Sequence, residues 1–343
     1  MTRSRGVVLG AASLLTVGAG LALGAIYLSP ARAAVGPLPA VGLSLPAESR
    51  FVVGIDVRRF VASPLYRRYS DKMPVRPQAF AELQERTGLD PERDIDQVVI
   101  AGQGPTRSDQ GVVLVLGRFD RYKLSRAIET EKRGVTWKDY QGTTVYLFGE
   151  AANRRSGAAA FLDDHTIVLG GRPLVESVIA SHASGEGNLR SNAKVVALLE
   201  QVRPGSTFWM VGDQSLMDQM PRSVPAPGAP MSGGPAPMQS LQLPGLKSMI
   251  VTGDLDPVMA VEATGEAADV TAAKNLADVV RGFVALAALQ ANQRPELREL
   301  ASAVSVSTEE TRVHVAARFP YELLDSLQPK RGPAAAAPRS EPH

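Results

Sequence analysis

Two apolar segments of the chain share one pattern of hydrophobic and polar positions. Phe51–Asp56 and Phe208–Asp213 are each an apolar run that ends in an aspartate and precedes a helical pattern. Each segment also follows a proline, Pro46 in one case and Pro204 in the other. Short apolar runs bounded by turn residues are typical of buried strands. We therefore predict two related halves, each of which begins with one of these strands.

Residues 48–203 are predicted to form the first α+β domain. Apolar and alternating runs predict strands at Phe51–Ile55, Gln97–Ala101, Val112–Leu116, Val135–Lys138, Thr143–Phe148, Ala158–Leu162 and Thr166–Leu169. Helical spacing predicts helices at Phe60–Tyr69, Gln78–Thr87, Pro173–Ser181 and Asn192–Val202, and a further one that carries Leu124 and Ile128 on one face. We expect Gly88 to end the second helix in the left-handed conformation and Asp120 to cap the third.

Residues 204–327 are predicted to form the second α+β domain, in much the same order. The predicted strands are Phe208–Gly212, Leu246–Thr252, Val258–Thr264, Ala303–Ser307 and Thr311–Phe319, and the predicted helices are Val270–Gln290, Pro295–Ala301 and Pro320–Leu327. An insert at 221–245 is rich in Pro, Gly, Met and Ser, so we expect it to form neither a helix nor a ladder. Residues 328–343 are expected to be a disordered tail.

The predicted fold class is α+β, with two related halves that are each a mainly antiparallel sheet with helices packed on one face. The turn Asp163–Thr166 parallels Thr308–Thr311, and each precedes a strand, a proline and a helix. A chance likeness of two ordinary α+β patterns is the alternative to duplication. With its paired strands and its Thr87–Pro91 helix end, the chain resembles uncharacterised exported bacterial proteins, domains of unknown function built from repeated strand–helix–hairpin–helix units. That resemblance implies a place in the cell envelope and no known activity.

The first 33 residues are predicted to target the chain to the membrane. Val7–Leu28 carries no charge and is long enough to cross a bilayer, and Arg3 and Arg5 before it favour a cytoplasmic N-terminus. We expect a single-pass anchor in the inner (cytoplasmic) membrane, a Pro/Gly-rich spacer at 34–47 and an exported body. Ala31–Ala33 has the form of a signal-peptidase site, so the alternative is a periplasmic or secreted protein cleaved after Ala33.

The charge balance of the exported part argues against nucleic-acid binding. Of 37 Lys and Arg residues, three lie in the targeting segment, which leaves 34 against 35 Asp and Glu residues. A nucleic-acid footprint needs a basic surplus on one face. The chain has no cysteine, which excludes disulfides, thiol catalysis and cysteine-based zinc sites.

Four groups of residues invite a chemical interpretation. Ser191 and Lys194 match the S-x-x-K pattern of serine acyl-transfer enzymes, but K-T-G and S-D-N elements are missing, and Ser191 stands where a helix cap is expected. Asp56 and Asp213 could be paired carboxylates across the halves or two helix caps. His165 follows Asp163 and Asp164 in a pattern that fits a hairpin turn better than a metal site.

The fourth group, Gly102–Pro105, joins two strands and lacks the Gly-Lys-Ser/Thr of a phosphate loop. We therefore assign no catalytic, cofactor-binding or metal-binding residue. The apolar face of Val270–Gln290 is interpreted as core, with a groove for a partner as the alternative. The sequence favours a non-enzymatic, membrane-anchored envelope protein that binds or scaffolds a partner outside the cytoplasm. The alternatives are an exported small-ligand-binding protein with an interdomain site and an exported serine acyl-transfer hydrolase that uses Ser191 and Lys194.

Overall fold

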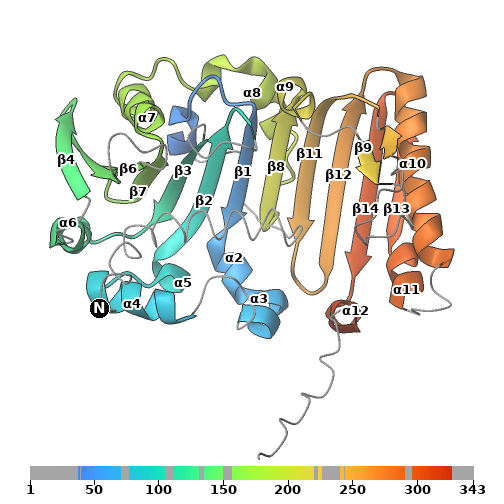
Figure 1. Ribbon diagram of the computed structural model, residues 1–343, viewed down its shortest axis with the longest axis horizontal. Helices are drawn as coiled ribbons and strands as arrows, with labels where there is room; N and C mark the ends of the chain where they lie inside the picture. The colour runs from blue at the N-terminus through green and yellow to red at the C-terminus, as the bar shows by residue number, and fades with distance from the viewer. Residues whose placement is uncertain are drawn as a thin grey trace, which may run out of the picture.

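One continuous antiparallel sheet of twelve strands dominates the fold (Figure 1). The computed structural model describes residues 38, 40–70, 77–104, 111–130, 135–149, 157–219, 223–225, 240–242, 244–289 and 296–326. The sheet has the order β13-β14-β12-β11-β8-β1-β2-β3-β7-β6-β5-β4, and every neighbouring pair is antiparallel. The α+β class with an antiparallel sheet is therefore confirmed.

The elements follow one another closely along the chain. The strands of the first half are β1 (Phe51–Asp56), β2 (Ile95–Gly102), β3 (Gly111–Gly117), β4 (Val135–Tyr140), β5 (Thr143–Phe148), β6 (Gly157–Asp163) and β7 (Thr166–Gly170). Its helices are η1 (Ala40–Ser44), α2 (Val57–Ala62), α3 (Pro64–Tyr69), α4 (Pro77–Thr87), α5 (Pro91–Asp94), α6 (Arg121–Thr130), α7 (Arg172–Ser184), η4 (Leu189–Ser191) and α8 (Ala193–Leu199).

Among the described residues, the second half has fewer helices than the first. Its strands are β8 (Phe208–Asp213), β9 (Ser223–Pro225), β10 (Ser240–Gln242), β11 (Leu246–Asp254), β12 (Met259–Ala267), β13 (Val304–Glu309) and β14 (Arg312–Phe319). Its helices are α9 (Gln214–Met217), α10 (Val270–Leu289), α11 (Glu296–Ser302) and α12 (Tyr321–Ser326). The strands β9 and β10 form a separate two-stranded sheet in the described part of the chain.

The two halves join through the two strands whose sequences are alike. β1 and β8 are antiparallel neighbours at the middle of the sheet, and Val53 is paired with Met210. On one side of that pair Phe51 lies opposite Gly212, and on the other side Ile55 lies opposite Phe208. When the two sequences are aligned on their phenylalanines, this ladder is symmetric about Val53 and Met210. The halves are thus related by an approximate two-fold axis through the sheet.

The strand order outward from this axis is the same in both directions. In the first half it runs β1-β2-β3-β7-β6, and in the second half it runs β8-β11-β12-β14-β13. The first half then continues into β5 and β4, whereas the second half stops at β13. The prediction of two halves with one topology is confirmed in these five strands. Their division into domains at residues 203 and 204 stays a prediction.

Helices cover both faces of the sheet in the first half, whereas we expected helices on one face only. Val98 and Val99 are consecutive residues of β2 and belong to different cores. One core contains Val99 with side chains of α7 and α8, such as Val175 and Leu198. The other contains Val98 with side chains of α4 and α6. Because consecutive strand residues point to opposite faces, near-continuous apolar strands indicate cover on both sides.

In the second half one face of the sheet carries the helix α10. Its residues Ala273 and Ala277 are fully buried with Val313 of β14. On the opposite face the strands β12 and β14 present Thr264 and His314, which are hydrogen-bonded at 3.0 Å. Antiparallel sheets commonly have one such solvated face. The expected arrangement with helices on one face therefore holds for the outer strands of this half, whereas α8 packs against the other face at β8.

Three local predictions differ from the structure or lie outside it. The expected helix Phe60–Tyr69 is two helices, because Ser63 in extended conformation and Pro64 end α2 and begin α3. The insert 221–245, expected to lack any ladder, contains the paired strands β9 and β10. The predicted membrane segment and the tail lie outside the described residues. Within the described part of the chain, no helix is both long and apolar enough to cross a membrane.

Candidate functional site

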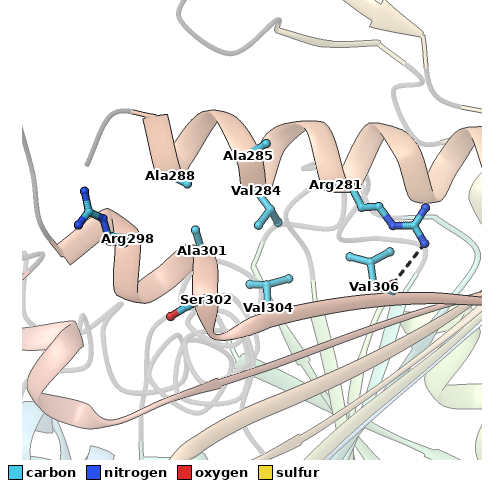
Figure 2. Close-up of a pocket in the computed structure, with 9 residues that line it drawn as sticks. All are labelled: Arg281, Val284, Ala285, Ala288, Arg298, Ala301, Ser302, Val304 and Val306. Atoms are coloured by element: carbon cyan, nitrogen blue, oxygen red, sulfur yellow. Dashed lines mark hydrogen bonds between the residues drawn. The ribbon is translucent and has the colours of Figure 1, made fainter. Parts of the chain in front are cut away.

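An open trough lies at the outer end of the second half, between α10, α11 and the edge strand β13 (Figure 2). Its volume is about 390 Å³, within the roughly 300–1,000 Å³ of typical ligand pockets. It is lined by Arg281, Val284, Ala285, Ala288, Arg298, Ala301, Ser302, Val304 and Val306. Six of these nine side chains are apolar, so the trough offers mainly a hydrophobic surface. We refer to it as the α10–β13 trough.

The sequence of α10 explains why this helix lines a trough as well as a core. Apolar residues occupy far more of its circumference than one contact with the sheet requires. The small residues Ala273 and Ala277 allow the N-terminal part to lie close against the sheet. Further along, Val284 and Ala288 point toward β13 and α11, as Figure 2 shows, and Ala285 also lines the trough. The core interpretation of this helix thus holds for its N-terminal part, and the groove interpretation suits its C-terminal part.

Arginines stand at the two ends of the trough (Figure 2). Arg281 binds the carboxylate of Asp278 at 2.8 Å and donates to the backbone carbonyl of Val306 at 3.3 Å. Arg298 forms no ion pair with any side chain that the structure describes. No carboxylate is among the nine lining residues. The Arg298 end is therefore positive, whereas Asp278 compensates the charge of Arg281 at the other end. The Arg298 end suits an anionic group on whatever occupies the trough.

The lining of the trough supplies contact surface and hydrogen-bond donors. Its one hydroxyl, on Ser302, donates to the carbonyl of Glu299 at 2.8 Å. No imidazole or carboxylate stands among the lining residues to act as a base toward that hydroxyl. The arrangement suits binding of apolar side chains or chain segments next to a negative charge.

Ser191 and Lys194 do not share a helix turn. Ser191 is the last residue of η4 and donates its hydroxyl to the carbonyl of Asn188 at 2.8 Å. The helix α8 starts after Asn192, whose side chain accepts from the amide of Val195. The expected capping role of Ser191 is therefore wrong, because the neighbouring Asn192 is the cap. The amine of Lys194 would lie one turn from the hydroxyl of Ser191 only if both residues were in one helix. The helix α8 starts at Ala193, two residues after Ser191.

Asp56 and Asp213 are helix caps, as the simpler interpretation expected. Asp56 accepts from the amide of Arg59, and Asp213 accepts from the amide of Leu216. They lie at opposite ends of the β1–β8 ladder because the two strands are antiparallel, so they are not paired carboxylates. Burial raises the pKa of Asp56 and outweighs the hydrogen bond and the positive charge of Arg59, which act in the opposite direction.

The turn and loop interpretations of the other two groups are confirmed. Asp164 and His165 form the turn of the β6–β7 hairpin, and Asp163 accepts from the amide of His165 at 2.7 Å. Gly102 ends β2 on the way to β3, so this loop joins two strands. Within the described ranges, no group of three or more His, Asp or Glu side chains could hold a metal ion.

The residues of the trough were not singled out from the sequence. Arg298, Val304 and Val306 belong to different elements from α10 and come together only in the folded chain. The available signal was the apolar circumference of Val270–Gln290, which exceeds what one sheet contact uses. The exposed Leu289, of which 74% is accessible to solvent, is the end of that same surface.

Comparison with known proteins assigns no family. No protein-family model matches the chain, and no curated protein matches it. Among solved structures, the chain is similar to crystal form I of TP0453, with a TM-score of 0.43 and 10% sequence identity. The similarity covers 82% of this chain and 95% of that chain. No functional conclusion rests on a likeness at this level.

Proposed function

We propose that the protein is a non-enzymatic, membrane-anchored protein of the cell envelope that binds a protein partner outside the cytoplasm, and that the α10–β13 trough is its binding surface. The observation that carries this proposal is the trough itself, an open hydrophobic surface at the edge of the sheet with arginines at both ends. Apolar contact surface with arginine is characteristic of protein interfaces. The uncharged segment Val7–Leu28 supports the membrane location.

The two alternatives find less support. A small-ligand site between the halves would need a cleft there, whereas β1 and β8 are hydrogen-bonded neighbours in one ladder. The trough belongs to the second half alone. A serine hydrolase that uses Ser191 and Lys194 would need the hydroxyl and the amine one helical turn apart. Ser191 instead precedes the cap of α8 and is bonded to a backbone carbonyl.

Site-specific photocrosslinking in intact cells tests this function. A photoreactive amino acid at Ser302 stands in the trough, and the same amino acid at Ser305 stands on the opposite face of β13. Both serines are exposed, so they form a matched pair. We expect the Ser302 position to give a discrete protein adduct that Ser305 does not give, and we expect Val304→Asp to weaken it. Equal adducts from both positions, or none from Ser302, would contradict the proposal.

A further inference from the structure

The β13 strand leaves one of its backbone edges unpaired in the described sheet. It is the last strand of the sheet and pairs with β14 alone. The carbonyl of Ala303 accepts from the amide of Arg318 at the end of β14, whereas that of Val306 accepts from the side chain of Arg281. Backbone groups of successive strand residues point alternately to either side. Val304, Val306 and Thr308 therefore direct their amides and carbonyls away from the sheet.

The internal repeat shows what occupies the same edge in the first half. A row of paired residues runs outward from Val53 through Ile100, Val113 and Leu169 to Ala159 of β6. The matching row from Met210 runs through Val251, Ala263 and Val315 to Val306 of β13. Val306 is therefore the counterpart of Ala159.

Ala159 is paired on its outer side with Tyr146 of β5. The first half thus completes its edge with an antiparallel strand of its own chain. The side chain of Tyr146 is buried in the core that also contains Leu124 and Ile128 of α6. The helix α6 follows β3 as α10 follows β12. The position that corresponds to Tyr146 lies beside Val306, which lines the α10–β13 trough.

We infer that the partner binds by adding an antiparallel strand to β13, with a large apolar side chain in the α10–β13 trough and a carboxylate at Arg298. This inference rests on the proposed function and names the mode of binding. Peptides that add to a sheet edge gain affinity from backbone hydrogen bonds and specificity from pockets for alternate side chains. The outward amides and carbonyls of Val304 and Val306 supply the backbone hydrogen bonds, and the trough supplies a pocket for a side chain.

Arg281 covers this edge through a hydrogen bond to Val306 that an incoming strand can replace. Its bond to the carbonyl of Val306 is 3.3 Å long, at the weak end of hydrogen-bond lengths, while its bond to Asp278 is 2.8 Å. Proteins often protect the edge of a sheet by covering it with a helix or a charged side chain, and Arg281 reaches this edge from α10. An incoming amide can replace the guanidinium at Val306 while Arg281 stays paired with Asp278. A second copy of the chain is a poorer occupant, because the lining of its trough would bring a second Arg298 and no carboxylate to pair with the first.

Peptide selection on the full chain in detergent tests strand addition. A phage-displayed library of random dodecapeptides is selected on the protein, and the enriched peptide is synthesised with single N-methyl groups along its backbone. We expect enriched peptides with alternating apolar residues, an aromatic residue and a carboxylate. N-methylation at every second position should reduce affinity at least about tenfold, because each such position loses a backbone bond. The intervening positions should tolerate the methyl group.

Two variants of β13 separate a backbone role from a side-chain role. Val306→Pro removes an outward amide, which an edge strand tolerates, and should reduce peptide affinity at least about tenfold with little change in the melting temperature. Val306→Ala keeps the amide and should preserve the alternating N-methyl pattern. In amide hydrogen exchange, the peptide should slow Val304, Val306 and Thr308.

Other outcomes would overturn strand addition. Strand addition would be contradicted if no peptide were enriched, or if N-methylation were tolerated equally at all positions. The proposed function would still be tested separately by the photocrosslinking experiment. A dimer in sedimentation with these amides already protected would assign the edge to a second copy. Faster exchange of Val304 and Val306 after deletion of residues 327–343 would assign it to the tail of the same chain.

Discussion

The indole ring of Trp209 lies directly over the backbone of Gly54, at the ladder that joins the two halves. The two residues are paired across β1 and β8. A Cβ atom added to Gly54 would stand 2.4 Å from Cε2 of the indole ring, and Trp209 is only 1% exposed. Glycine at this position is what allows the largest buried side chain of the central ladder to lie flat on the sheet.

The Gly54→Ala substitution should therefore destabilise the protein. The added methyl group must displace a fully buried ring, which costs about 1–3 kcal/mol in a packed core. Urea denaturation followed by tryptophan fluorescence measures the change. Gly282→Ala is the matched control, because outside the adjacent backbone of its own helix no atom lies within 4 Å of a Cβ at that exposed position. The control should be neutral or stabilising by up to about 1 kcal/mol, and equal stability of the two variants would contradict the packing argument.

Asn192→Ala should destabilise the protein far more than Ser191→Ala. The Asn192 amide donates to the carbonyls of Ala47 and Ser49 at 2.8 and 2.9 Å, and its oxygen accepts from Val195 at 3.2 Å. Loss of these three bonds costs about 2–3 kcal/mol at about 1 kcal/mol each. Ser191→Ala loses a single bond to the carbonyl of Asn188.

Asn192→Asp refines this comparison, since a carboxylate keeps the cap acceptor and loses both donors. Its stability should stay clearly below that of the wild type in a thermal melt. A larger loss from Ser191→Ala than from Asn192→Ala would mean that the serine anchors this segment.

Glu176→Gln should lower stability at neutral pH and have no effect in strong acid. Burial alone would raise the pKa of Glu176, but hydrogen bonds from Lys138 and Arg172 outweigh it and hold the pKa below its usual value. A carboxyl group with a lowered pKa stabilises the fold above its unfolded pKa, and that contribution is lost as the pH falls through the folded pKa. We expect a difference of about 1 kcal/mol at pH 7.

Urea midpoints from pH 7 down to pH 3 measure this difference. Glu200→Gln is the control, because Glu200 is exposed and forms no ion pair with the described side chains. The difference for Glu176→Gln should change over this range by more than the difference for Glu200→Gln. A Glu176→Gln difference that persists unchanged in acid would exclude the ion pairs as its source.

Tyr321→Phe should destabilise the second half. The Tyr321 hydroxyl donates to the carbonyl of Leu255 at 2.7 Å, and both residues are buried with Met259. Removal of the hydroxyl leaves a buried carbonyl without this donor, which costs about 1–3 kcal/mol. Arg68→Ala is the comparison, since its pairs with Glu322 and Asp325 are exposed and should matter less in the same denaturation assay.

Local patterns in the sequence determined most of the individual elements. Gly88 ends α4 with a positive φ of 73°, and Asp120 accepts from the amide of Lys123, as predicted. The likeness of Phe51–Asp56 to Phe208–Asp213 indicated the duplication. Helix ends and strand patterns depend on residues close together in the sequence, so composition and spacing are sufficient to find them. The duplication was visible because it repeats one such local pattern.

The tertiary structure alone decided which strands meet and which faces are covered. Nothing local in Phe51–Asp56 specifies that its partner is a strand more than 150 residues later, and local patterns did not show that α7 and α4 lie on opposite faces. The trough depends on the same non-local choice, because Arg281, Arg298 and Val306 come from three separate elements. Local propensity selects the type of each element, whereas pairing and packing between distant elements follow from burial and from backbone hydrogen bonds that only the complete sheet satisfies.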